Sequence, residues 1–276
     1  MDINSIATNI KLQDDGIYYP KGGTESISYP SEGNDHCFQI EKNSFWFKHR
    51  NNIIIDAVKH HCPDNVFFDV GGGNGFVAKG LTESGIEAIL VEPGSGTQNA
   101  KKSGLPWVIC STLNGAGFRE SSLGSVGLFD VVEHIQDDLG FLKEVHRYLK
   151  PGGLVFITVP AYKLLWSSED VYAGHFRRYT LRSMRRVLKN AGFQPVYSTY
   201  FFSILPLPIL FARCIPSWLG IKTKNHDLNK QLKDHQHDKG LLTRMMDAIW
   251  DKERSRLQKG RRIPFGGSCF FIATKP

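Results

Sequence analysis

An acidic residue followed by glycines at every second position is the part of this sequence best suited to hold a ligand. The apolar run 66–68 ends at Asp69, and Gly71, Gly73 and Gly75 follow in the pattern D-x-G-x-G-x-G. Glycine is needed where the backbone has a positive φ or must approach a ligand closely. A helix that starts directly after such a turn presents unpaired N–H groups and the positive end of its dipole. The pattern predicts a buried strand, a tight turn and a helix that form a nucleotide-type pocket.

Two further carboxylates follow apolar stretches in the same way. Glu92 comes about twenty residues after the glycine turn, where a carboxylate can accept hydrogen bonds from both hydroxyls of a ribose. Asp130 ends the stretch 125–130, and the segment Leu-Lys-Pro-Gly-Gly at 149–153 leads into another apolar stretch. A dinucleotide fingerprint, G-x-G-x-x-G/A, would need a small residue where Phe76 stands. The motifs therefore favour a nucleotide-like ligand other than a nicotinamide dinucleotide.

In this order, the four motifs resemble those of class I S-adenosylmethionine-dependent methyltransferases. The resemblance covers residues 41–200 and the last strand. It implies that S-adenosylmethionine is the cofactor, that the glycine turn contacts its methionine part and that Glu92 holds its ribose. Residues 110–112 would flank the adenine, although no acid stands there as in many relatives. By this resemblance the cofactor-binding residues are Asp69, Gly71, Gly73, Asn74, Gly75, Glu92, Pro93, Cys110, Ser111, Asp130 and Val131.

The segment 41–51 resembles an aromatic-and-arginine helix that precedes the first core strand in a subset of these enzymes. Trp46 and Phe47 could shield a sulfonium, and Arg50 could pair with the cofactor's carboxylate. The alternative is a helix whose aromatic side chains only pack it against the sheet.

The residues predicted to meet the methyl acceptor follow the fourth and fifth strands of the core. His134 is a candidate base or acceptor contact, because its ordinary pKa near 6.5 suits proton transfer, or it packs beneath the adenosine. The loop 160–180 contains a G-H-x-R-x-Y-T segment that recurs in the same subset. In it His175 beside Asp170 could form an oriented base, or the loop could be bonded only within itself. The predicted catalytic residues are His134, His175 and Tyr162, and the predicted acceptor contacts are Trp166, Asp170 and Arg178.

The composition and charge of the chain limit its partners. Of 276 residues, 41% are hydrophobic, the net charge is +7 and the pI is about 9.1. The basic residues are spread out, which favours solvated faces over a nucleic-acid groove. Five scattered cysteines without a CxxC pair argue against a disulfide framework or a zinc site, so we expect no metal and a reducing, cytoplasmic location. The start of the chain lacks the pattern of a signal peptide.

The periodicity of apolar residues predicts an α/β fold. Apolar strands alternate with helices from residue 65 onwards, which indicates a parallel sheet covered on both faces. With the resemblance, the fold class is a Rossmann-like, doubly wound, mixed seven-stranded sheet with an antiparallel last strand. We expect an irregular arm at 1–40, a core at 41–202 and 264–276, and a helical insertion at 203–263.

The insertion is the best guide to the acceptor. Its apolar stretch 201–219 is interrupted by prolines and Arg213, so it is too broken to predict a membrane span. It could roof a hydrophobic pocket, touch a membrane surface, form a dimer face or simply pack in the core.

Three functions fit these observations. The first is a methyltransferase that uses S-adenosylmethionine to methylate an oxygen or carbon of a small, partly apolar molecule. The second is an NAD(P)-dependent oxidoreductase, against which Phe76 counts. The third is a protein that binds the cofactor without chemistry.

Overall fold

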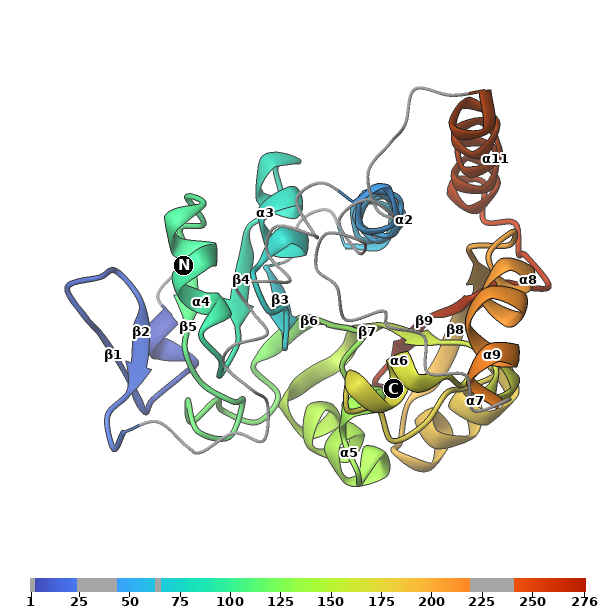
Figure 1. Cartoon of the computed structure of the whole chain (residues 1–276). Helices are drawn as coiled ribbons and strands as arrows, with labels where there is room; N and C mark the ends of the chain where they lie inside the picture. The colour runs from blue at the N-terminus through green and yellow to red at the C-terminus, as the bar shows by residue number, and fades with distance from the viewer. Residues whose placement is uncertain (1–2, 24–43, 63–65, 219–240) are drawn as a thin grey trace.

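A single mixed sheet forms the centre of the computed structural model, which describes residues 3–23, 44–62, 66–218 and 241–276 (Figure 1). The strand order is β1-β2-β5-β4-β3-β6-β7-β9-β8. The strands are β1 Ile10–Leu12, β2 Tyr18–Pro20, β3 Phe67–Val70, β4 Ala88–Val91, β5 Trp107–Ile109, β6 Leu123–Phe129, β7 Leu149–Pro160, β8 Gln194–Phe201 and β9 Ser268–Thr274.

The seven strands expected from the sequence are β3 to β9, and the expected fold class is confirmed. β3 pairs in parallel with β4 and β6, and β9 runs antiparallel between β7 and β8. β3 therefore lies where the strand order reverses, which is where open α/β sheets bind ligands at the carboxyl ends of their strands.

Helices cover both faces of this sheet. Leu142 and Met184 place α5 and α7 in one apolar layer, whereas Ile54, Leu81 and Trp250 place α2, α3 and α11 in the other. Successive strand residues such as Phe67 and Phe68 point into opposite layers, as the pleat requires. The α-helices are α2 Phe45–His61, α3 Phe76–Glu83, α4 Gly96–Lys102, α5 Asp138–Tyr148, α6 Ser168–Tyr172, α7 Leu181–Asn190, α8 Pro206–Ile209, α9 Ile215–Trp218 and α11 Leu241–Gln258.

The start of the chain differs from the expected irregular arm. A 3-10 helix, η1 (Ile3–Ser5), precedes β1, and β1 and β2 form an antiparallel hairpin. β2 joins the core sheet in parallel with β5 through the pair Tyr18 and Ile109. The apolar alternation in these strands is only three residues long, which is why periodicity did not identify them. The rest of the arm, residues 24–40, lies outside the described residues.

The helical insertion follows β8, as expected. It runs through α8, a π-helix η4 (Leu210–Cys214), α9 and α11, and the polar link expected at 222–239 lies outside the described residues. Since β8 is parallel to β7, α8 begins at the same edge of the sheet as the glycine turn. Among the helices that the structure describes, none combines the length and the apolar character needed to cross a bilayer.

Candidate active site

The glycine turn after β3 leaves open space at the carboxyl edge of the sheet. Gly71, Gly73 and Gly75 have φ values of +71°, +54° and +74°, so each occupies the left-handed region that favours glycine. A Cβ built on Gly73 would meet no heavy atom within 4 Å. Gly75 is the N-cap of α3 and makes no side-chain cap. The backbone at Gly73 therefore borders a space that side chains leave empty.

Asp69 supports this turn from beneath. Its side chain is fully buried, and its Oδ2 accepts a hydrogen bond from the N–H of Ala78 in the first turn of α3 at 3.1 Å. A Cβ on Gly72 would approach the same oxygen to 2.4 Å. The carboxylate thus fixes the angle between β3 and α3, and the absence of a side chain at Gly72 makes room for it.

Glu92 joins the loops after β3 and β4. Its Oε2 accepts from the N–H of Gly73 at 2.9 Å, and its Oε1 accepts from the N–H of Gly94 at 2.6 Å. Burial raises the pKa of Glu92, while these two hydrogen bonds act in the opposite direction. Gly96 at the start of α4 packs so closely that an added Cβ would lie 2.5 Å from the carbonyl oxygen of Gly73. The carboxylate is therefore held beside the open turn.

The loop after β5 meets the amino-terminal hairpin. Cys110 donates its N–H to the carbonyl of Tyr18 at 2.8 Å, and its Sγ lies 3.8 Å from the carbonyl of Pro93. Burial raises the pKa of the Cys110 thiol, and Glu92 and Asp15 act in the same direction. The neighbouring Ser111 is also buried. The side of the crevice predicted to flank the adenine is thus closed by the hairpin.

Sequence reasoning missed the polar group on that hairpin. The hydroxyl of Tyr19 donates to Asp15 at 2.9 Å, and the amide of Gln98 donates to both residues. Burial and then Asp15 raise the pKa of Tyr19 to about 12. The only sequence signal was the Tyr18-Tyr19-Pro20 cluster in the supposed arm, and it gave no pairing partner.

Asp130 is held at the end of β6 in a left-handed conformation with φ +57°. Its Oδ1 accepts from the hydroxyl of Thr158 at 3.0 Å, and its Oδ2 pairs with Nε of Arg50 at 2.7 Å. Asparagine and aspartate tolerate this region better than most residues, but it still has a conformational cost. The methyl groups of Val131 lie where a side chain on Gly71 would be, 2.8 Å from the built Cβ. The loops after β3 and β6 are therefore in contact.

The aromatic side chains of α2 surround the Arg50 guanidinium. Arg50 lies 5.9 Å from the ring of Trp46 and 5.8 Å from that of Phe47, and its Nη2 donates to the carbonyl of Phe129 at 3.0 Å. Trp46 also stacks on Phe202 with ring centroids 5.0 Å apart. Arg50 thus lies at the end of β6, and Arg50 and Trp46 both pack α2 against the core.

Two histidines meet on the acceptor side. His134 belongs to the 3-10 helix η2 (Val132–His134), and its ring lies 4.7 Å from that of His175 at an interplanar angle of 77°. Burial and the neighbouring His175 lower the pKa of His134 to about 4. Burial and then Asp130 raise the pKa of the adjacent Glu133 well above its usual range.

Asp170 lies behind His175 and Arg178. Its Oδ1 contacts Nδ1 of His175 at 2.9 Å and Nε of Arg178 at 2.7 Å, and its Oδ2 accepts from the N–H of Ser167 at 2.9 Å. Burial raises the pKa of Asp170, but the hydrogen bonds from His175 and Arg178 outweigh it and hold the pKa below its ordinary value. Asp170 is buried and its three partners come from the protein, so the structure places it as a support for its neighbours.

Tyr162 and Trp166 extend the same loop. Tyr162 has φ +55° and stacks on Tyr200 with ring centroids 5.0 Å apart, and Phe265 lies 5.5 Å away. Burial and then Tyr200 raise the pKa of Tyr162. Trp166 is half-buried at the end of the 3-10 helix η3 (Lys163–Leu165). The predicted acceptor residues therefore share one loop at the carboxyl edge.

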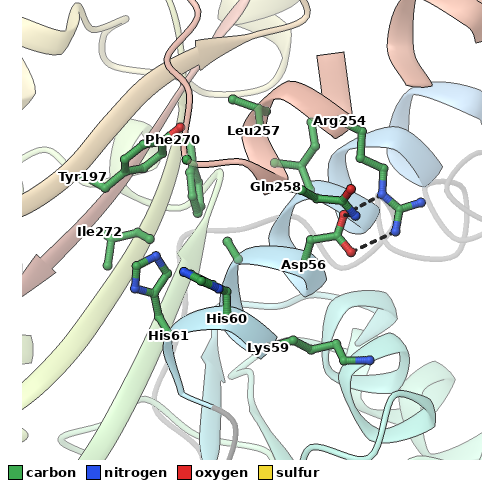
Figure 2. Close-up of a pocket in the computed structure, with 13 residues that line it drawn as sticks. Asp56, Lys59, His60, His61, Tyr197, Arg254, Leu257, Gln258, Phe270 and Ile272 are labelled. Carbon is green, nitrogen blue, oxygen red and sulfur yellow. Dashed lines mark hydrogen bonds and ion pairs between the residues drawn. The ribbon is translucent and has the colours of Figure 1, made fainter. Parts of the chain in front are cut away.

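A separate cavity of about 450 Å³ lies between α2, α11 and the strands β8 and β9 (Figure 2). His60, His61, Tyr197 and Phe270 are among its walls, and Asp56 at its rim pairs with Arg254 at 2.5 Å. Since the last turn of α2 leads towards β3, this cavity is at the amino ends of the strands, opposite the glycine turn. None of the predicted site residues lines it.

Comparisons with known proteins point to one family. Residues 48–198 match the family model described as a methyltransferase domain. A probable S-adenosylmethionine-dependent methyltransferase of Mycolicibacterium smegmatis is 23% identical over 159 residues, which are 56% of this chain and 62% of that protein. The ubiquinone biosynthesis O-methyltransferase of Parvibaculum lavamentivorans is 28% identical over 100 residues, which are 33% of this chain and 38% of that protein.

Solved structures show the same fold. Phosphoethanolamine N-methyltransferase 2 of Haemonchus contortus, in complex with S-adenosyl-L-methionine, matches with a TM-score of 0.55 and 20% identity. The match covers 94% of this chain and 62% of that one. The chain therefore spans less than two thirds of the length of these relatives.

Proposed function

Because this chain belongs to the class I S-adenosylmethionine-dependent methyltransferases, we propose that the crevice at the carboxyl ends of β3, β4 and β6 transfers a methyl group to an oxygen or carbon of a small, partly apolar acceptor. The family is shown by a match over more than half of the chain. The acceptor and the roles of individual residues are our inference from the site.

The observation that carries the proposal is the open turn at Gly73. Its N–H is bonded to Glu92, and the space beyond its α-carbon is free of protein atoms to 4 Å. A side chain there would fill the crevice. This is the arrangement that a nucleoside cofactor requires, with a backbone that it can approach closely and a carboxylate beside it for its hydroxyl groups.

The residues around the turn fit the parts of S-adenosylmethionine. Glu92 would accept hydrogen bonds from the ribose hydroxyls, and Pro93, Cys110 and Ser111 would flank the adenine. Around the methionine part we place Trp46, Arg50, Asp130, Val131, Gly71, Asn74 and Gly75, with Asp69 as the support of the turn. Arg50 is positioned by Asp130 and by the Phe129 carbonyl, so its positive charge is fixed near the strand ends.

Methyl transfer needs alignment, exclusion of water and a route for the acceptor's proton. When bound, S-adenosylmethionine supplies an electrophilic methyl group on a sulfonium. We propose that His134, His175 and Tyr162 face the acceptor and that Trp166 and Arg178 line its pocket. Asp170 would act as a positioning residue, because it fixes the His175 ring and the Arg178 guanidinium.

The surface around this loop supports a partly apolar acceptor. Twelve large apolar side chains are exposed in the described part of the chain, and eight of them lie in the acceptor loop, in residues 203–218 of the insertion or in the segment before β9. The π-helix η4 contacts η3, and Phe265 packs near Tyr162, so these segments adjoin one another. The eight are Leu164, Val171, Tyr172, Phe176, Leu207, Phe211, Trp218 and Phe265.

The charge of the same region supports contact with an anionic membrane surface. Residues 161–218 contain eight Lys or Arg side chains and two acidic ones, so they carry +6 of the chain's net charge of +7. Two of these basic side chains, Lys163 and Arg213, are exposed on η3 and η4, the adjoining segments that carry apolar side chains, and such a surface can rest on anionic lipid. We propose that residues 201–219 touch the membrane from which an amphiphilic acceptor is taken, and we expect no nucleic-acid partner.

Two measurements test the proposed function. Calorimetry should show that the purified chain binds S-adenosylmethionine more tightly than NADH, and tighter binding of NADH would overturn the proposal. Cell extract incubated with the chain and methyl-labelled cofactor should then transfer the label to the organic-soluble fraction. Label found only in nucleic acid or protein would refute the acceptor class.

A further inference from the structure

Three side chains beside the acceptor loop have the composition of a metal site. Glu133, His134 and His175 each place one ligand atom within 4.8 Å of the others. They come from two segments, η2 and the loop after α6, which the hydrogen bond from Phe176 N–H to the Glu133 carbonyl joins at 2.8 Å. The sequence did not predict a metal site here, because the positions of the three residues along the chain match no familiar spacing of metal ligands.

Both histidines are oriented as metal-binding histidines are. Nδ1 of His175 lies 2.9 Å from Asp170, whose carboxylate is fixed by Arg178 and Ser167. His134 is hydrogen-bonded to the carbonyl of Ala173. Because a carboxylate or carbonyl can only accept, each ring donates one N–H there, and in its neutral form it keeps a lone pair on its other nitrogen. Such outer partners fix the tautomer and ring direction of metal ligands.

Glu133 supplies the anionic member of the group. The residue is 1% exposed, and its Oε2 has no hydrogen-bond partner among the residues that the structure describes. A buried carboxyl oxygen without a hydrogen-bond partner is costly. Asp130, Arg50 and Arg178 are the charged groups that act on this carboxyl group, and both guanidinium groups are already paired, Arg50 with Asp130 and Arg178 with Asp170.

We propose that Glu133, His134 and His175 bind a divalent first-row transition-metal ion of the Zn²⁺ or Co²⁺ kind. Two imidazoles and one carboxylate are the donor set that such ions prefer, and three protein ligands leave a position open. The site goes beyond the proposed function, because ion binding requires neither cofactor nor acceptor. If the proposed function holds, the histidines would act on an acceptor hydroxyl through the ion.

Cobalt is the probe, since its visible absorption reports low-coordinate nitrogen and oxygen ligands. The full chain, treated with a chelator and dialysed, should bind one Co²⁺ with a new visible band, and Zn²⁺ should displace it. His134→Ala and His175→Ala should each weaken Co²⁺ binding at least tenfold, and Asp170→Asn should weaken it roughly tenfold through the loss of the outer carboxylate. The matched control is His60→Ala, a histidine on α2 outside the group, which should bind as the parent does.

The proposal is overturned if the parent binds no Co²⁺ at a millimolar concentration, or if both histidine variants retain the band and the affinity. Glu133→Gln is a third variant, and the two histidine variants decide the test if it does not fold. Circular dichroism on the same samples shows that the variants are folded, and calorimetry with S-adenosylmethionine measures their cofactor binding. The calorimetry also separates this test from the proposed function. A chain that binds the ion but not the cofactor would support the metal site and contradict the proposed methyltransferase activity.

Discussion

At the scale of single residues, Glu92 joins two loops of the site and is the residue that we propose binds the ribose of the cofactor. The sequence placed it at the end of a strand, because an acid at the end of a short apolar stretch is a local signal, and β4 does end at Val91. The structure adds that its two oxygens already accept from Gly73 and Gly94, so the carboxylate is preorganised by the loops it joins.

Replacing Glu92 with Gln should weaken S-adenosylmethionine binding by about 1.5–3 kcal/mol, because charged hydrogen bonds are lost. Calorimetry measures the change, and Glu83→Gln on the exposed face of α3 serves as the matched control. An unchanged affinity would contradict the ribose assignment.

Gly73→Ala separates backbone strain from ligand exclusion. Gly73 and Gly85 both have positive φ, and a Cβ on either would meet no protein atom within 4 Å. Both Ala variants should therefore lose about 1–2 kcal/mol of unfolding free energy in urea. Only Gly73→Ala should also weaken the cofactor, by tenfold or more, because its methyl group would enter the crevice. Equal cofactor affinities in the two variants would show that the crevice lies elsewhere.

At the scale of elements, α11 is fixed to α2 by a buried carboxylate. Glu253 contacts Nε2 of His49 at 2.9 Å and accepts from the N–H groups of Phe202 and Ser203 at 2.7 and 2.9 Å. Burial raises the pKa of Glu253, but the hydrogen bonds from His49 and from Ser203 and Phe202 outweigh it, so the pKa lies below its ordinary value. One side chain thus joins the insertion, the end of β8 and the helix that carries Arg50.

This arrangement predicts a stability that depends on pH. The folded pKa of Glu253 is below the unfolded value of about 4.3, so its contribution to stability is complete above that value and is lost as the pH falls from there through the lower folded pKa. Glu253→Gln should lower the unfolding free energy at pH 7 by about 1–3 kcal/mol. Urea titrations at pH 7 and below pH 4 should show this difference shrinking in acid, whereas a constant difference would contradict the linkage.

The helices α8 and η4 carry the proposed membrane contact. Phe211 is 64% exposed, and Phe211→Asp should reduce binding to vesicles that contain phosphatidylglycerol by about tenfold, since burial of such a side chain is worth about 1.5–3 kcal/mol. Leu12→Asp, at an apolar side chain of β1 with 52% exposure, is the control. Co-sedimentation measures both, and a Phe211→Asp variant that binds like the parent would refute the contact.

At the scale of the whole molecule, the sequence predicted the core sheet and its helices. The alternation of apolar strands with helices is a local signal that can be seen along the chain. The order of the glycine turn and the acids that follow it then indicates the family, and the family implies the order of the strands in the sheet. The hairpin β1–β2 was missed because its strands are short and its partner β5 lies about ninety residues away. For the same reason the sequence named His134 and His175 singly but could not show that their rings meet or that Glu133 is buried between charged neighbours.

The edges of the nine-stranded sheet also affect how the protein behaves in a crowded solution. β1, the outermost strand on one side, is only three residues long, and β8 on the other side contains Pro195 and a register shift beside it. Short or interrupted edges offer a poor template for a strand of a neighbouring molecule. By capping β5, the hairpin replaces a flat parallel edge with a short one, so resistance to aggregation through β-pairing is built into the first twenty residues of the chain.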